Sequence, residues 1–122
     1  MFKIRAAQMQ AFAASEERDF ERRTALRLRQ YFPELRGRSD EDLLDLVRKG
    51  KERAGRYGIR SHYHVSLYVG LTAQFGEGFD TDPALPWAAE ILQREGIHAA
   101  VRIGELYLRA LPDAPASGPE PK

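Results

Sequence analysis

The sequence contains no cysteine among its 122 residues, which excludes a disulfide-stabilised scaffold and any metal site with cysteine ligands. It also lacks a long hydrophobic run, since the best stretch, residues 65–73, is nine residues long and includes Ser66, Gly70 and Thr72. A membrane-spanning helix needs roughly 18 consecutive apolar residues. The sequence therefore predicts that this chain is not an integral membrane protein. With 43% hydrophobic and 30% charged residues, it predicts a single globular domain over residues 1–111.

Charge is nearly balanced overall but unevenly distributed. The net charge is +1, yet residues 1–60 hold 15 Lys and Arg against 10 Asp and Glu, whereas residues 61–122 hold 4 against 8. Fifteen of the 19 cations are arginine, which binds carboxylates or phosphates through paired hydrogen bonds. A solvated helix face is the alternative interpretation. The N-terminus does not resemble a secretory signal, and together with the absence of cysteine this predicts a cytoplasmic protein.

No segment shows the sustained alternation of a strand, so the predicted fold is all-α, a compact bundle of about five helices. Residues 112–122 contain four prolines and are predicted to form a disordered tail. The connections between helices are short, which favours antiparallel neighbours. The predicted helices span residues 5–32, 39–57, 61–76, 83–95 and 98–111.

Two of these helices carry clear end signals. Ser39 precedes three acidic residues, as expected of an N-cap and a first turn that complements the helix dipole. Gly58 stands where a left-handed C-terminal residue is expected. Gly50 and Ala54 fall on the apolar stripe of the same helix, which predicts close approach by another helix.

Charged residues interrupt the apolar stripe predicted for the first helix. Glu16 and Arg27 lie within it, and Arg23 lies on its edge. Because an unpaired charge is costly to bury, these side chains must pair internally or face a partner. A two-fold homodimer through this helix would explain them equally well. In the last helix, Val101 and Tyr107 are predicted to be buried.

The polar residues indicate no catalytic or metal site. His62 and His64 are two residues apart and point to different sides of a helix, so they cannot bind one metal from one face. Asp80 and Asp82 superficially resemble a calcium loop, but its glycine and its last ligand are missing, and Asp82 before Pro83 is better explained as a helix cap. No nucleophile motif or phosphate-binding loop is present. The sequence therefore predicts that the protein is not an enzyme and binds no cofactor.

Binding functions are therefore favoured over catalysis. Arginines gathered near the ends of the first two predicted helices could follow a phosphate backbone, although interspersed carboxylates dilute them, so nucleic-acid binding is the second class. The segment FGEGFDTDPALPW, residues 75–87, is the most distinctive of the chain. Its aromatic side chains could close one corner of the bundle, or they could form a hot spot for a protein partner.

The motifs AQMQAF, RDFERR, RYGIRSHYHVSLYVGL and FGEGFDTDPALPWAAEIL resemble those of small proteins encoded in bacterial type VI secretion clusters, near genes for spike proteins and toxic effectors. The resemblance covers residues 4–111. It implies a protein-binding accessory, an adaptor or chaperone-like protein of a secretion spike or effector, with an immunity protein that binds a toxin as the alternative. The expected partner is a larger bacterial protein. The candidate partner-binding residues are Arg23, Arg27, Phe79, Asp80 and Trp87.

Overall fold

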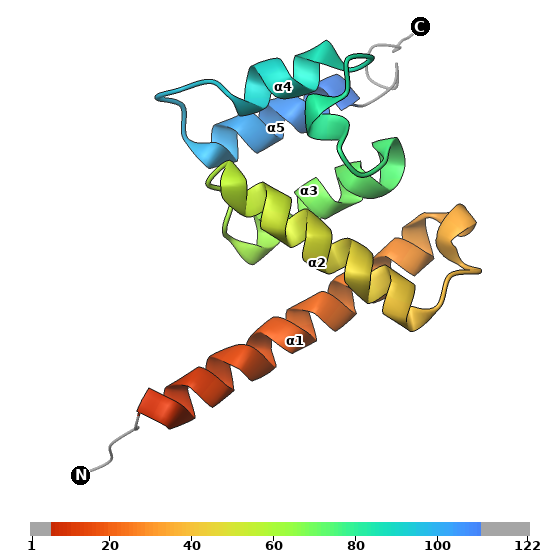
Figure 1. The fold of residues 1–122 in the computed structure, drawn as a ribbon, viewed down its shortest axis with the longest axis vertical. Coiled ribbons are helices and arrows are strands. Elements are labelled where there is room, and N and C mark those ends of the chain that lie inside the picture. Colours follow the sequence, from red (N-terminus) through yellow and green to blue (C-terminus); the bar gives the residue numbers. More distant parts are fainter. Residues whose placement is uncertain (1–5, 111–122) are drawn as a thin grey trace, which may run out of the picture. The chain divides into compact units, whose positions relative to one another are not determined.

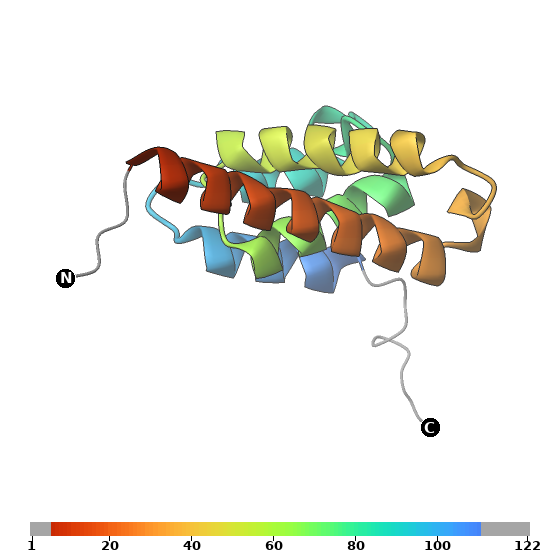
Figure 2. The ribbon, with the colours of Figure 1, turned by 90° about the horizontal axis from the view of Figure 1, so that it is seen from below.

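The computed structural model describes residues 6–110, without the side chains of residues 6–9, 11 and 12. The chain is all-α (Figure 1 and Figure 2), as predicted, and residues 6–110 contain no strand. The predicted tail, residues 112–122, lies outside the described part. Five helices follow one another with two short 3-10 helices between them: α1 (Ala6–Tyr31), η1 (Pro33–Leu35), α2 (Asp40–Arg56), α3 (His62–Phe75), η2 (Phe79–Thr81), α4 (Pro86–Leu92) and α5 (Ala99–Ala110).

Contacts divide the chain between Arg48 and Lys49 into two compact units. The statement that residues 1–111 form a single domain stays a prediction. Within residues 6–110, no helix is long and apolar enough to cross a membrane.

In the first unit, the second half of α1 runs antiparallel to the first turns of α2. Two ion pairs define the register: Arg29 Nη1 lies 2.7 Å from Asp40 Oδ1, and Arg48 Nε lies 3.0 Å from Glu21 Oε1. The paired residues are eight apart on each helix, so both pairs fit the same antiparallel alignment. Ser39 caps α2 as predicted, because its Oγ accepts a hydrogen bond from the Asp42 N–H at 3.1 Å.

The buried stripe of α1 differs from the predicted one. Glu16, Arg23 and Arg27 are exposed, and Tyr31, expected on the inner face, is 72% exposed. The buried acid of α1 is Glu21, which pairs with Arg48. The inner face is rotated away from the predicted charges and comprises Phe20, Glu21, Thr24, Ala25 and Leu28.

In the second unit, α3 and α4 each contact α5 and η2. Tyr68 and Val69 of α3 are fully buried. The predicted close approach at Gly50 is confirmed, because a Cβ added there would lie 2.9 Å from Val69 Cγ2.

The Gly50→Ala substitution is expected to destabilise the protein by about 1 kcal/mol, although alanine normally favours a helix interior. The added methyl group would collide with the stiff, β-branched side chain of Val69. Gly70→Ala is the matched control, since a Cβ at Gly70 of α3 meets nothing within 4 Å. Urea unfolding measures both variants. Equal stabilisation of the two would contradict a close crossing at Gly50.

Helix α4 begins later than predicted, at Pro86 instead of Pro83. The Asp82 carboxylate accepts a hydrogen bond from the Ala84 N–H at 2.9 Å, and the Asp82 carbonyl accepts one from the Leu85 N–H at 2.9 Å, so Asp82 stabilises a turn and does not cap the helix. Leu85 has φ −124° and ψ 64°. This non-helical conformation follows from the next residue, because proline disfavours helical geometry at the residue before it.

Helix α5 exposes residues that were predicted to be buried. Val101 is 57% exposed and Tyr107 is 41% exposed, so their predicted burial is wrong. Ile103 and Leu106 are buried. Arg102 binds three backbone carbonyls, of Tyr57, Leu92 and Ile97, at 2.7, 2.6 and 3.0 Å. Arg102 thus joins the ends of α2 and α4 to the start of α5.

Candidate protein-binding surface

The FGEGFD segment places its second aromatic ring and its aspartate in the interior of the second unit. Gly76 and Gly78 have φ of 101° and 84°, a left-handed conformation that other residues rarely adopt. This tight turn directs Phe79 and Asp80, each 1% exposed, into the core. Phe79 packs on Tyr68 with ring centroids 5.1 Å apart. The burial of Phe79 and Asp80 therefore fits the interpretation that the aromatic side chains of this segment close a corner of the bundle.

Asp80 is held by the side chains of Arg53 in α2 and of Tyr57, the residue that follows α2. Arg53 donates from Nε and Nη2 to Oδ1 at 3.1 and 2.7 Å and from Nη2 to Oδ2 at 2.9 Å. The Tyr57 hydroxyl donates to Oδ2 at 2.6 Å. A carboxylate with this many donors is well satisfied despite its burial. The cluster fastens η2 to α2.

The pKa values in this cluster follow from burial and hydrogen bonding. Burial tends to raise the pKa of Asp80, but the hydrogen bonds from Tyr57 and Arg53 and the positive charge of Arg53 outweigh it and hold the pKa below its ordinary value. Burial and the hydrogen bond to Asp80 raise the pKa of Tyr57 to about 12. Burial also raises the pKa of Tyr68. At neutral pH the cluster therefore consists of a carboxylate, a guanidinium and neutral phenols.

Trp87 lies at the edge of the same aromatic group. Its ring meets Phe75 edge-on at 5.7 Å, and the Arg109 guanidinium lies 6.0 Å from the Trp87 ring. Trp87 is half-buried. Of the candidate partner-binding residues in this segment, Phe79 and Asp80 lie in the interior, and Trp87 alone retains an accessible part.

The histidines serve local structure. His64 Nδ1 lies 2.6 Å from Ser61 Oγ at the start of α3, and His98 Nδ1 accepts a hydrogen bond from the Ala100 N–H at 3.0 Å at the start of α5. Residues 6–110 contain no group of three or more His, Cys, Asp or Glu side chains that could hold a metal ion.

A hollow of about 230 Å³ lies beside the Asp80 cluster, between α2 and α3. Most of its charges are paired: Arg53 binds Asp80, and Arg56 Nη2 lies 3.8 Å from Glu52 Oε2. Lys49 also has a partner. This hollow offers little unpaired charge to a ligand.

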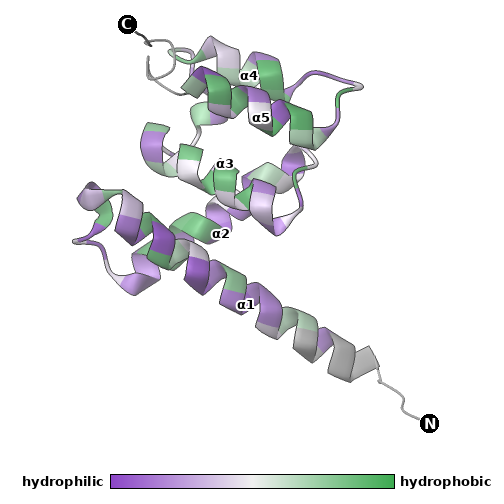
Figure 3. Cartoon of the chain, turned by 180° about the vertical axis from the view of Figure 1, so that it is seen from behind, coloured by the Kyte–Doolittle hydropathy of each residue, from purple (hydrophilic) through white to green (hydrophobic). Residues whose placement is uncertain are grey.

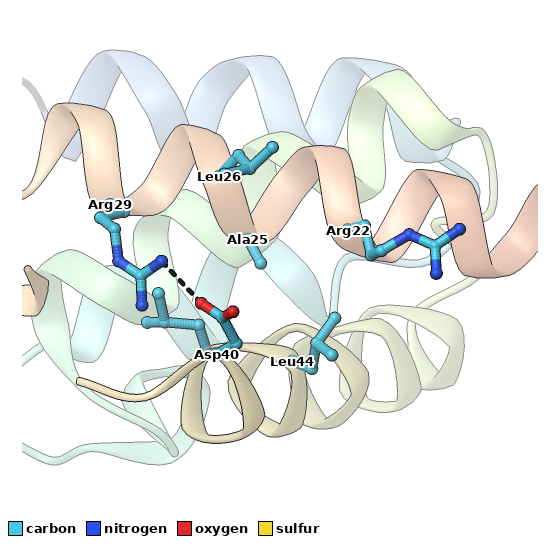
Figure 4. A pocket seen from close by; sticks show the side chains of 7 residues that line it. Arg22, Ala25, Leu26, Arg29, Asp40 and Leu44 are labelled. Atoms are coloured by element: carbon cyan, nitrogen blue, oxygen red, sulfur yellow. Dashed lines mark hydrogen bonds and ion pairs between the residues drawn. The ribbon is translucent and has the colours of Figure 1, made fainter.

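A second hollow of about 230 Å³ lies in the first unit, between the antiparallel α1 and α2 (Figure 4). Ala25 and Leu43 form a buried apolar floor, and Leu26 at its margin is 62% exposed. Arg22 and Arg29 flank it along α1, and Figure 4 shows the Arg29 guanidinium turned toward Asp40 on α2. The complete lining is Arg22, Ala25, Leu26, Arg29, Asp40, Leu43 and Leu44, which we call the α1–α2 pocket.

The remaining candidate residues, Arg23 and Arg27, also lie on α1 but are not part of the pocket lining. Both are exposed, and they flank Leu26 in the sequence. In contrast, Arg22 binds Asp19 at 2.7 Å, and Arg29 binds Asp40 and the Arg38 carbonyl. No interaction occupies Arg23 or Arg27 within the described residues. α1 therefore presents two unpaired guanidinium groups beside an exposed leucine.

Comparisons gave no match. Neither protein family models, nor curated proteins, nor solved structures match this chain. The geometry of the molecule itself carries the functional argument.

The sequence identified Arg23 and Arg27 but not the pocket on the same helix. Leu26, Arg29 and Leu44 gave no individual signal, because the pocket exists only where α1 and α2 pack together. Complementary charges at matching spacing, Glu21 and Arg29 on one helix and Asp40 and Arg48 on the other, were the available indication of that antiparallel pair.

Proposed function

We propose that this chain is a non-catalytic, protein-binding accessory of the bacterial cytoplasm that takes an acidic, amphipathic segment of a larger protein into the α1–α2 pocket. The observation that carries this proposal is the apolar hollow with Arg22 and Arg29 on its rim, together with the unpaired Arg23 and Arg27 on the exposed side of the same helix. The apolar floor suits an aliphatic or aromatic anchor. The guanidinium groups suit carboxylates that flank that anchor.

The resemblance to type VI secretion accessories supports the choice of partner, a secretion spike or a toxic effector. An adaptor or chaperone-like role requires a surface that binds a segment of such a protein without chemistry. An immunity protein would use the same kind of surface to bind a toxin. The anchor-and-carboxylate chemistry is common to both roles.

Nucleic acid is the alternative ligand, because Arg18, Arg22, Arg23 and Arg27 are all exposed along α1. The apolar floor of the pocket favours protein, because it has no use in binding a phosphate backbone.

We expect Leu26→Glu to weaken binding of purified spike or effector proteins about tenfold or more in isothermal titration, since it places a carboxylate at the apolar margin of the pocket. Arg27→Glu is expected to weaken binding about threefold to tenfold, and more when combined with Arg23→Glu. Tyr63→Glu is the matched control for Leu26→Glu, with 68% against 62% exposure. Arg60→Glu is the control for Arg27, because Arg60 is also exposed.

Salt dependence distinguishes the two ligand classes. An interface centred on an apolar anchor should lose little affinity between low and physiological salt, whereas a phosphate-binding face should lose affinity steeply. Binding that is unchanged in the Leu26→Glu variant and in the Arg23→Glu, Arg27→Glu double variant would refute the proposal. Duplex DNA that binds tightly with a steep salt dependence and is released by the arginine variants would assign α1 to nucleic acid instead.

A further inference from the structure

The outer face of α5 is apolar, although its inner face already packs in the core. Ile103, Leu106 and Ala110 are buried on one side, while Val101 and Leu108 are 57% and 68% exposed on the other. Figure 3 shows hydrophobic residues recurring along α5. A helix that is apolar on both sides is normally covered on both sides. Residues Val101, Gly104 and Leu108 follow helical spacing along one line, which we call the outer stripe of α5.

Gly104, in the middle of the outer stripe, has no role in the packing of the chain itself. A Cβ added at Gly104 would meet nothing within 4 Å, whereas Gly50 is required by its contact with Val69. Glycine inside a helix is unfavourable relative to alanine. Gly70 has similar free space, but it lies between the polar residues Ser66 and Gln74. Gly104 differs because exposed, large apolar residues stand on either side of it.

We propose that the outer stripe of α5 is a self-association surface on which a second copy of α5 crosses antiparallel at Gly104. Val101 precedes Gly104 by three residues and Leu108 follows it by four. An antiparallel copy therefore places its Leu108 over Val101, and its Val101 over Leu108, with glycine at the crossing. This self-complementary spacing is what a two-fold interface requires, and the glycine lets the two backbones approach closely.

The charges beside the stripe allow this pairing. Glu105 lies next to Gly104, and Arg94 Nη1 binds both of its carboxylate oxygens at 2.8 and 2.9 Å. Two copies therefore bring together two Glu105–Arg94 ion pairs, so the positive and negative charges of these pairs balance at the crossing. A single helix crossing is small compared with stable interfaces, so the dimer is expected to be weak and dependent on concentration. The outer stripe shares no residue with the α1–α2 pocket, so this inference is independent of the proposed function.

Sedimentation equilibrium of the full chain tests the proposal. The mass is expected to rise from the monomer value of 13.9 kDa toward twice that value with increasing concentration. Leu108→Glu should abolish the rise, and Tyr63→Glu, at an equally exposed position of α3, should not. Gly104→Ala should raise the thermal midpoint of the dilute monomer and weaken the dimer about tenfold. A chain that stays monomeric at every concentration, or a dimer that survives Leu108→Glu, overturns the proposal.

The absence of cysteine allows a direct test of orientation. Val101→Cys and Leu108→Cys proteins are mixed and oxidised, and the crosslinked species are identified by mass spectrometry. The antiparallel arrangement predicts that the disulfide between the two different variants forms fastest. Preferential crosslinking of identical variants would indicate a parallel pairing and overturn the antiparallel crossing. Tyr63→Cys, at an exposed position of α3, is the control for random collision and should crosslink least.

Discussion

Replacing Asp80 by alanine is expected to lower the free energy of unfolding by about 3 kcal/mol. The substitution leaves the Arg53 guanidinium and the Tyr57 hydroxyl without their common acceptor and removes the tie between η2 and α2. Because a domain of this size has a total stability of about 5–15 kcal/mol, the loss is a substantial fraction. Urea denaturation monitored by circular dichroism measures it. Asp82→Ala is the matched control in the same segment and should cost about 1 kcal/mol or less.

The contribution of Asp80 is expected to depend on pH in the acid range. Its pKa is lowered in the folded protein, so its stabilising contribution is complete above the unfolded pKa of about 4 and is lost as the pH falls below that value. The stability difference between the wild type and Asp80→Asn should therefore be constant near neutral pH and narrow at lower pH. A difference that is the same at pH 3 and pH 7 would contradict a functioning carboxylate in the cluster.

The contribution of Tyr57 to stability is expected to depend on pH in the alkaline range, and it falls as the pH rises. Its pKa is raised to about 12 in the folded protein, so its contribution is present below the unfolded pKa of about 10 and is lost as the pH rises toward 12.

Combining Arg53→Met with Asp80→Leu should recover part of the lost stability, because an apolar pair leaves no unpaired buried charge. Full additivity of these two substitutions would contradict direct coupling between the side chains.

Replacing Arg102 by methionine is expected to destabilise the protein by about 2–3 kcal/mol. Arg102 donates three hydrogen bonds to the carbonyls of Tyr57, Leu92 and Ile97. The first two carbonyls lie at the C-terminal ends of α2 and α4, where the helix dipole also favours a positive charge. Thermal unfolding and urea titration should agree on the loss.

Two controls separate geometry from charge at this position. Arg102→Lys keeps the positive charge but lacks the planar donor group, so it should restore only a minor part of the stability. Arg109→Met removes an exposed arginine from the same helix and should change stability by about 0.5 kcal/mol or less. Equal effects of Arg102→Met and Arg109→Met would show that the carbonyl contacts contribute nothing.

Local sequence signals predicted the helices well. Ser39 caps α2, Gly58 takes a positive φ of 79° after it, and Ser61 caps α3. The one misplaced start, at α4, came from choosing the first proline of the segment although Pro86 prevents helical geometry at Leu85. The same rule, applied to both prolines, would have found the correct start.

The sequence predicted only half of the candidate surface. Arg23 and Arg27 were identified because charges interrupted an expected apolar stripe, and their exposure follows from a different cause, a rotation of the buried face toward Glu21 and Leu28. Phe79 and Asp80 were identified as distinctive, but their chemistry is used inside the fold. Polar and aromatic residues at a turn have the same sequence pattern whether the turn faces inward or outward.

The sequence by itself determined the all-α class, most helix boundaries and the close crossing at Gly50, because capping, proline geometry and helical periodicity act within a few residues of the chain. Only the tertiary structure decided which faces are buried. Val101 and Ile103 are both β-branched and two residues apart on α5, yet one is exposed and the other is buried. Burial depends on which neighbours pack against a helix, and that choice is made by contacts between residues far apart in the sequence.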